Sequence, residues 1–544
     1  MSLAGHLAPS RAPVFRGRPA RGGLLVAGLA VGALMLLPVA YLVLRAAGAS
    51  TESWDLILRA RTLALAFRSI GLAAAVTASA VAIGVPLAWL TARTDLPSRR
   101  LWSVLVALPL VIPSYVGAFA LIAALGPGGI VQDLLAKPFG VERLPDISGF
   151  VGAWLALTLF TYPYVYLLVA SGIKGLDPSH EEAARGLGES AWSTFVRVTL
   201  PMLRPSIAAG SLLVALYTLH DFGAVSLMRF QTFTQAIYLQ YRGAFDRTPA
   251  AILSLFLVAL ALGVLVMEHK ARGRARYYRS GAGSKRPSRV LSLGRWKWPA
   301  LLFCGAVTAA AFALPVSVIA FWLIRGAVSG DGLNLTWAAA GNSVLVSGAG
   351  ALVALVAALP VALLAVRFPG RSTTVMERLS YSGYALPGIV VALALVFFTA
   401  NFSPALYQSL PLVVIAYVVL FLPQAVEPLS ASLLQLGPRM EEAARALGVR
   451  RTRVFARIVA PLIARGLVSG AALVFLTAMK ELPATLLLRP TGFETLATRV
   501  WTGATAGLYA HAAGPALLLV AACAVPLYVL ARRVEVREVE VKAD

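Results

Sequence analysis

The chain has 544 residues, of which 59% are hydrophobic and only 13% are charged, and its formal net charge is +24. This composition excludes an ordinary soluble protein, because the chain is filled with apolar runs of about 20 residues that are typical of transmembrane helices. The two cysteines, Cys304 and Cys523, both lie in apolar runs, which favours packing over a disulfide or a metal site.

Twelve apolar runs follow one another along the chain, and each predicts a transmembrane helix. They lie at about 22–45, 64–91, 101–125, 148–173, 205–228, 249–268, 298–325, 340–366, 376–400, 410–434, 466–488 and 510–531. Segments of alternating hydrophobicity, which would indicate a β-barrel, are absent from the sequence. We therefore expect an all-α polytopic membrane protein, since only helices and closed barrels satisfy every backbone polar group in lipid.

Basic residues mark one side of this arrangement. Arg93 and Arg100 follow the second run, Arg532 follows the last one, and the loop 269–297 holds ten lysine and arginine residues and no acidic one. By the positive-inside rule, this loop and both chain termini are cytoplasmic. The positive net charge is therefore a signal of topology, and we expect membrane lipids rather than nucleic acid to be its partner.

The two halves of the chain carry matching residues at matching positions. The aligned pairs are Ser69 with Ser343, Pro86 with Pro360, Arg93 with Arg367, Pro113 with Pro387, and Pro163 with Pro423. We predict a cytoplasmic segment 1–21, a six-helix half 22–268, a basic linker 269–297, a second six-helix half 298–531 and a cytoplasmic tail 532–544. Because six is even, the repeats are parallel, and such repeats enclose a central pathway at the interface of the halves.

A polar motif occurs once in each half, between the fourth and fifth runs. The first copy contains Glu181, Glu182, Ala183, Ala184, Gly188 and Pro201, and the second, 260 residues later, contains Glu441, Glu442, Ala443, Ala444, Gly448 and Pro461. Ser179 is placed to cap a short helix that stops at Gly188, and a second short helix would end at Pro201. Because two loops agree, we expect the same docking element to be presented twice to a two-fold partner.

These loops resemble the EAA motif of permease subunits in binding-protein-dependent ABC importers, and the resemblance covers nearly the whole chain. It implies a fold like that of type I importer permeases, in which each loop is a coupling helix that fits a groove of an ATP-binding subunit. The resemblance assigns ATPase coupling to Glu181, Glu182, Ala183, Ala184, Gly188, Glu441, Glu442, Ala443, Ala444 and Gly448. Val198 and Ala460 depart from the Ile and Leu of the family pattern.

The chain lacks the motor of such a transporter. A phosphate-binding loop needs Gly-x-x-x-x-Gly-Lys-Ser/Thr, and no lysine in this sequence directly follows a glycine. We therefore expect a subunit that is not itself an enzyme and binds no cofactor, with ATP and magnesium held by a homodimer of separate ATPase subunits. The resemblance also implies a periplasmic or surface-tethered binding protein and a place in the bacterial inner membrane.

Charged residues inside apolar runs are costly and are candidates for function. His220 and Asp221 lie in the fifth run, and Lys480 and Glu481 lie at the same offset in the eleventh. Two interpretations stay open. The charges form ion pairs between the halves, Asp221 with Lys480 or His220 with Glu481, or they line or gate the translocation pathway.

The segments 221–226 and 480–498 resemble the fused permeases of ferric-iron ABC importers, which implies Fe(III) as the transported substrate. Fused permeases also occur among thiamine and phosphonate relatives, so that another small solute is the alternative. A different class, a secondary transporter with internal repeats that needs no ATPase, is disfavoured by the doubled docking motif. No metal site is assigned to the chain.

Overall fold

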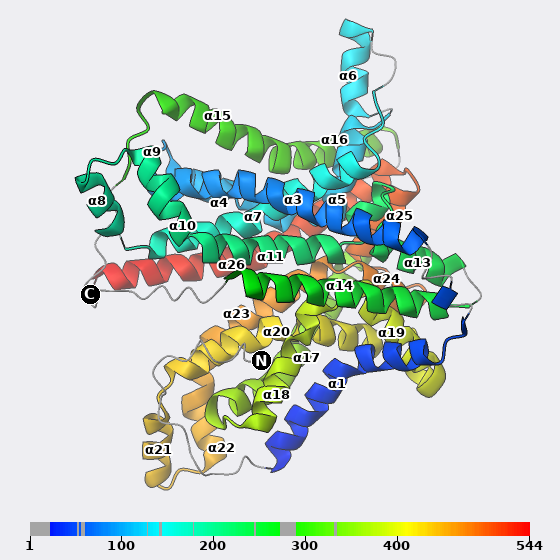
Figure 1. Ribbon diagram of the computed structural model, residues 1–544. Helices are drawn as coiled ribbons and strands as arrows, with labels where there is room; N and C mark the ends of the chain where they lie inside the picture. The colour runs from blue at the N-terminus through cyan, green and yellow to red at the C-terminus, as the bar shows by residue number, and fades with distance from the viewer. Residues whose placement is uncertain are drawn as a thin grey trace. The chain divides into compact units, whose positions relative to one another are not determined.

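The computed structural model describes residues 22–51, 54–55, 60–127, 129–140, 144–177, 179–243, 246–272, 290–330 and 335–543. The predicted N-terminal segment 1–21 and most of the predicted linker, residues 273–289, lie outside this part of the chain. What is described is almost entirely helical (Figure 1). The predicted tail 532–544 continues the last helix as far as Ala543.

Two compact units divide the chain. The first-half unit comprises residues 51–334 and 500–517, and the second-half unit comprises residues 1–50, 335–499 and 518–544. Helices α25 (Leu496–Thr505) and α26 (Tyr509–Ala543) run from one unit into the other.

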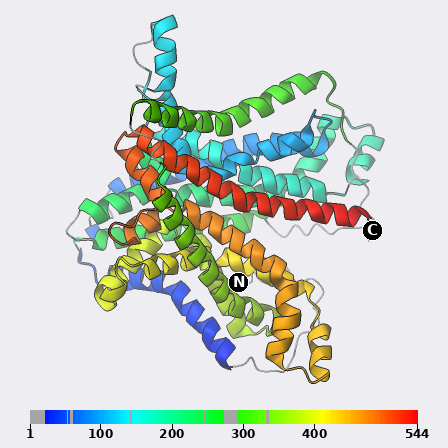
Figure 2. The same cartoon turned by 180° about the vertical axis from the view of Figure 1, so that it is seen from behind.

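The helices of the first-half unit are α3 (Ala60–Arg93), α4 (Arg99–Leu105), α5 (Ser114–Leu125), α6 (Ile130–Phe139), α7 (Phe150–Gly175), α8 (Ser179–Gly186), α9 (Ala191–Thr194), α10 (Leu200–Met202), α11 (Arg204–His220), α12 (Gly223–Leu227), α13 (Phe233–Gly243), α14 (Thr248–Arg272), α15 (Lys297–Thr308) and α16 (Leu314–Val328). Those of the second-half unit are α1 (Gly22–Ala47), α17 (Trp337–Arg367), α18 (Arg371–Ser380), α19 (Gly388–Phe402), α20 (Leu410–Gln435), α21 (Pro438–Ala446), α22 (Arg451–Val454), α23 (Ala460–Lys480) and α24 (Pro483–Leu488). Figure 2 shows α17 beside α23, with which it packs.

Each unit contains the helical segment that begins the other half of the sequence. Helix α1 packs against α17, α18 and α19 of the second half, and α16 packs against α5 of the first half. The predicted division into residues 22–268 and 298–531 therefore describes the sequence repeat. The second-half unit contains α1 of the first half, and the first-half unit contains α15, α16 and residues 500–517 of the second.

Membrane-spanning helices account for most of the chain. Ten described helices are long and apolar enough to cross a membrane, and there are twelve if each of two bent helix pairs is counted as one span. The sequence prediction of an all-α protein with twelve spans agrees with this count, although several of the spans are broken.

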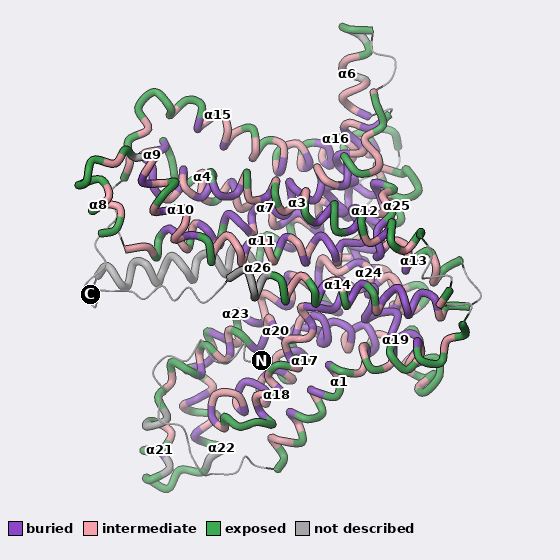
Figure 3. Tube along the Cα trace, viewed as in Figure 1, coloured by how far each residue is buried: buried purple, intermediate pink, exposed green. Residues whose placement is uncertain are grey.

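Proline breaks two of the predicted spans. The runs 101–125 and 376–400 were expected to be continuous, but α5 and α19 begin only after Pro113 and Pro387. The residue before each of these two prolines is extended, a conformation that avoids a clash with the proline ring. In the second half, the segments on either side of this break are bent by 108°. Helices α5 and α19 are apolar on every side and largely buried, so each lies in the core of its unit (Figure 3).

The end of the linker is clipped to the turn after α3. Thr94 and Leu291 form an isolated parallel bridge, and the carboxylate of Asp95 accepts the N–H of Leu293 at 2.8 Å. The same carboxylate pairs with Lys297, the first residue of α15, at 2.9 Å. This clip holds the start of α15 in the first-half unit and so helps to place a helix of the second sequence half there.

The clip predicts a pH-dependent contribution from Asp95. The hydrogen bond from Leu293, followed by Lys297, lowers the pKa of Asp95 below its ordinary value of 3.8. Because the folded pKa is depressed, the stabilisation is present above the ordinary value and is lost as the pH falls through the folded value. We expect Asp95→Asn to lower the midpoint of thermal unfolding in detergent at neutral pH. An equal deficit of the variant at a pH below the depressed pKa of the folded state would contradict a charge-dependent clip.

Candidate functional site

The first polar motif forms a short helix with defined ends. Helix α8 begins at Ser179, and its first N–H donates to the side chain of Asp177 at 3.0 Å. The predicted cap by Ser179 is therefore wrong, because the aspartate two residues earlier supplies the oxygen. At the other end Gly188 has φ +87°, with hydrogen bonds from Gly188 to Arg185 and from Glu189 to Ala184. These bonds are those of a Schellman motif, which confirms Gly188 as the helix stop.

The second motif repeats this geometry. Helix α21 begins at Pro438, as expected for a copy without a serine cap, and Gly448 has φ +78°. Val449 donates to the carbonyl of Ala444 at 3.2 Å, the counterpart of the bond from Glu189 in the first copy. We call α8 and α21 the docking helices.

Each docking helix is followed by a segment that leads back towards the long helices of its unit. A π-helical turn covers Phe195–Thr199 in the first copy and Phe455–Val459 in the second. In the first copy this helical stretch ends at Met202 and is bent by 64° from α11, which agrees with the predicted end at Pro201 to within one residue. In the second copy there is no such end at Pro461, which lies in the first turn of α23.

The first glutamate of the first motif is turned inward. Glu181 pairs with Arg93, the last residue of α3, with Oε1 2.7 Å from Nη2, and it accepts the hydroxyl of Thr199 at 2.9 Å. The side chain of Arg93 is 2% exposed and that of Glu181 is 19% exposed. Sequence reasoning noted Arg93 only as a topological mark and missed its pairing with the motif.

The first glutamate of the second motif is also turned inward and pairs with an arginine. Glu441 Oε1 lies 2.8 Å from Nη2 of Arg367, the last residue of α17, and Nη1 of Arg367 donates to the carbonyl of Leu436. The sequence did hold a signal for both pairs, because Arg93 and Arg367 occupy matching positions at the ends of matching helices.

The next residues of each motif point outward instead. Glu182, Ala183, Glu442 and Ala443 are all exposed. Leu187 is 87% exposed and Leu447 is 83% exposed, and each directly follows the last residue of its docking helix. Figure 3 shows α8 as mostly exposed. Each docking helix, together with the residue that follows it, thus presents a carboxylate, small side chains and one solvent-exposed leucine. These are features of a contact surface for another protein.

The buried carboxylate of the first half lies where its span breaks. The predicted run 205–228 ends at His220, and Asp221 Oδ1 accepts the N–H groups of Ala224 and Val225 at the start of α12. Ser114 Oγ donates to Oδ2 of Asp221 at 2.5 Å. The carboxylate thus supplies acceptors for N–H groups that the break leaves without an intrahelical partner.

In the second half Glu481 occupies the corresponding break. The predicted run 466–488 is interrupted after Lys480, and Glu481 Oε1 accepts the N–H of Ala484 at 3.1 Å. Gly388 stands at the position of Ser114, and a Cβ atom placed there would come within 2.4 Å of that oxygen. The two halves therefore fill corresponding spaces with different pairs of residues. The first half uses the shorter acid Asp221 with Ser114, and the second half uses the longer acid Glu481 with Gly388.

This exchange predicts a compensating pair. Gly388→Ser should displace Glu481 from the helix start and destabilise the protein by about 1–3 kcal/mol. Adding Glu481→Asp should recover part of the loss, because it reproduces the arrangement of the first half. The thermal midpoint of each variant in detergent measures this, with Glu481→Asp alone as the control. Additive losses in the double variant would show that the two positions are independent.

The basic partners of the predicted inter-half pairs lie beside these carboxylates in the chain. His220 is the last residue of α11 and Lys480 the last of α23. No residue that the structure describes forms a hydrogen bond with Nε2 of His220. Pairing of Asp221 with Lys480, or of His220 with Glu481, would join the two units and stays a prediction.

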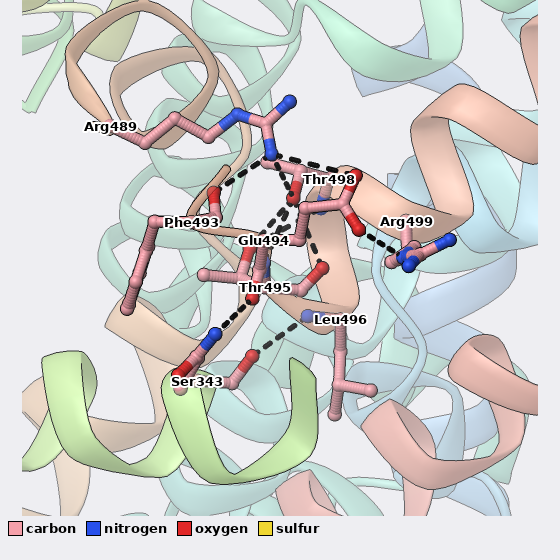
Figure 4. A network of polar contacts seen from close by, with 9 residues as sticks. Ser343, Arg489, Phe493, Glu494, Thr495, Leu496, Thr498 and Arg499 are labelled. Carbon is pink, nitrogen blue, oxygen red and sulfur yellow. Dashed lines mark hydrogen bonds and ion pairs between the residues drawn. The ribbon is translucent and has the colours of Figure 1, made fainter. Parts of the chain in front are cut away.

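A polar network holds the loop that follows the break in the second-half unit (Figure 4). Glu494 pairs with Arg499 and Arg489, and Nη1 of Arg489 donates to the carbonyl of Phe493 at 2.8 Å. Ser343 Oγ accepts the N–H of Leu496 at 2.8 Å, which ties this loop to α17. These contacts therefore hold in place a part of segment 480–498, the segment that resembles the ferric-iron permeases.

Comparisons with known proteins agree with this geometry. Residues 80–269 and 350–536 each match the family described as the inner membrane component of binding-protein-dependent transport systems. The chain is 35% identical to an Fe(3+)-transport system permease protein, FbpB 2 of Haemophilus influenzae, over 92% of this chain and 96% of that protein. It is 30% identical to the molybdenum transport system permease protein ModB of Escherichia coli K12, over 35% of this chain and 84% of that protein.

A ferric transport system permease protein, FbpB of Actinobacillus pleuropneumoniae, is 24% identical over 74% of this chain and 61% of its own length. The ModB match covers 35% of the chain, whereas both FbpB matches cover well over half of it and so extend over the two halves. The two matches to one family model therefore correspond to the internal repeat read from the sequence.

Proposed function

The chain belongs to the family of inner membrane components of binding-protein-dependent transport systems, and we propose that it is the importer permease for Fe(III). In this proposal the two units form the translocation pathway, and the docking helices receive two copies of a separate ATPase subunit. A binding protein delivers the substrate to the opposite side of the membrane, and both chain termini are cytoplasmic.

The doubled docking helix is the observation that supports coupling to an ATPase. Both copies present the same residues outward, a glutamate and an alanine followed by a bare leucine, on helices with the same glycine stop. A two-fold partner that binds one copy would bind the other in the same way. A secondary transporter has no use for two such surfaces, which disfavours that alternative.

Iron as the transported substrate is supported by a relative that aligns with this chain over nearly its full length. The FbpB 2 protein aligns with 92% of the chain, and the molybdenum permease proteins align with less than half of it. Thiamine, phosphonate or an oxyanion such as molybdate would be the substrate if iron is wrong. The same docking helices would serve any of these substrates.

We expect cells that depend on this chain to accumulate radiolabelled Fe(III), and molybdate in excess should leave that uptake unchanged. Glu182→Lys together with Glu442→Lys should abolish uptake while the protein stays folded in the membrane. Reversal of charge at both surfaces should lower retention of the ATPase subunit roughly tenfold or more, since interface charges are worth about 2 kcal/mol or more. Co-purification measures the retention.

Asp55→Lys, which reverses an exposed acidic residue that is not part of either docking helix, is the control for charge alone. Normal uptake and normal retention in the double variant would refute the docking assignment. Uptake of molybdate instead of Fe(III) by the unaltered protein would refute the substrate and leave the docking assignment standing.

A further inference from the structure

We infer that α3 and α17 transmit motion within their units, and we call these two helices rods. Each rod is attached to a docking helix by the arginine at its end, Arg93 or Arg367. Near its other end, each rod is attached by Ser69 or Ser343 to the segment that follows a broken span. The inference deepens the proposed function, because it names the residues that carry motion between the ATPase contacts and the pathway. Arg93 and Arg367 are positioning residues, since they act through the docking helices.

The attachment to the docking helix is buried and directional. In each half the arginine is the last residue of the rod, and its side chain is 2% exposed in Arg93 and 10% exposed in Arg367. The loop also contains an exposed pair, Arg197 with Glu189 at 3.4 Å, whose arginine side chain is 75% exposed. An exposed pair of this kind transmits little, because water screens it, whereas a buried charge-assisted pair holds its geometry.

The two attachments persist although the intervening chain differs in length. Arg367 lies 274 residues after Arg93, whereas Glu441 lies 260 residues after Glu181. The supporting contacts differ too, because Thr199 assists the pair in the first half and the carbonyl of Leu436 assists it in the second. The feature common to both halves is the link from glutamate to arginine.

The opposite end of each rod is also attached in the same way. Ser69 Oγ accepts the N–H of Phe233 at 3.2 Å, and Ser343 Oγ accepts the N–H of Leu496 at 2.8 Å. Both serines are buried, and both acceptors hold the chain shortly after the break at the intramembrane carboxylate. The docking helix and the broken span of each unit are therefore attached to one helix.

The spacing between the two attachments is the same in both rods. Ser69 and Arg93 are 24 residues apart, and so are Ser343 and Arg367, which corresponds to about 36 Å of α-helix. Both helices continue through their single prolines, Pro86 and Pro360. Since a helix resists extension, displacement of the docking helix moves the far loop, and displacement of the loop moves the docking helix by the same linkage.

Adjacent residues of the motif thus have different tasks. Glu182 and Glu442 are exposed and available to the ATPase subunit, whereas Glu181 and Glu441 hold the rod. Loss of the arginines should leave the ATPase contact in place and remove the connection to the pathway.

The test uses the complex with its ATPase subunit and its binding protein loaded with Fe(III). Arg93→Met together with Arg367→Met should retain the ATPase subunit, and the ratio of binding-protein-stimulated to basal ATPase activity should fall to near one. Uptake of radiolabelled Fe(III) should be lost. Exchange of the charges, Arg93→Glu with Glu181→Arg and Arg367→Glu with Glu441→Arg, should restore part of the stimulation.

Arg197→Met, which removes the exposed ion pair of the same loop, is the matched control and should leave the ratio unchanged. Ser69→Ala with Ser343→Ala tests the far ends and should also lower the ratio without loss of the ATPase subunit. Its control is Ser254→Ala, because Ser254 is buried and bonds only to its own helix at Ala250 among the described contacts.

Full stimulation in the folded arginine variant would overturn the inference. Loss of the ATPase subunit in that variant would also overturn it, since the arginines would then build the docking surface instead of transmitting from it. If the arginine variants give either result while Glu182→Lys with Glu442→Lys still releases the ATPase subunit, the inference fails and the proposed function stands.

Discussion

An ion pair between a buried arginine at the end of a long helix and a glutamate in a short one connects the docking helix of each unit to the rest of that unit. The side chains of Arg93 and Arg367 are almost withdrawn from solvent, so each needs a carboxylate nearby. Glu181 and Glu441 meet that need, and in doing so they connect each docking helix to the long helix that ends at the arginine. The following glutamate and the leucine five residues later are then exposed. Within one motif, the first glutamate therefore serves the attachment to the long helix, and the exposed residues that follow are the ones proposed to bind the partner.

The two halves of the internal repeat share the same local interactions even where the residues that make them differ. Asp221 with Ser114 and Glu481 with Gly388 fill the same place, and both acids accept N–H groups at the start of a short helix. This capping role gives the intramembrane carboxylates a function within their own units. It explains why acids occur in apolar runs without requiring that they bind the transported substrate.

Much of the fold could be predicted from the sequence, and what could not depends on contacts between distant segments. Hydropathy located the spans, and glycine chemistry located the helix stops at Gly188 and Gly448, because both signals are local. The exchange of α1 and α16 between the units left no mark in hydropathy, since apolar helices look alike whichever neighbour they contact. The pair of Arg93 with Glu181 joins residues 88 positions apart, so the spacing of the motif alone could not reveal it. Asp177 and Ser179 are both good helix caps, and only the structure distinguishes them.

The central claim is that one chain carries two complete docking sites. The mass of the intact complex, measured by native mass spectrometry after purification with the ATPase subunit, tests this claim most directly. The account predicts one copy of this chain with two copies of the ATPase subunit. A stable complex of two copies of this chain with two ATPase subunits would show that each chain offers only one functional site, and would contradict it.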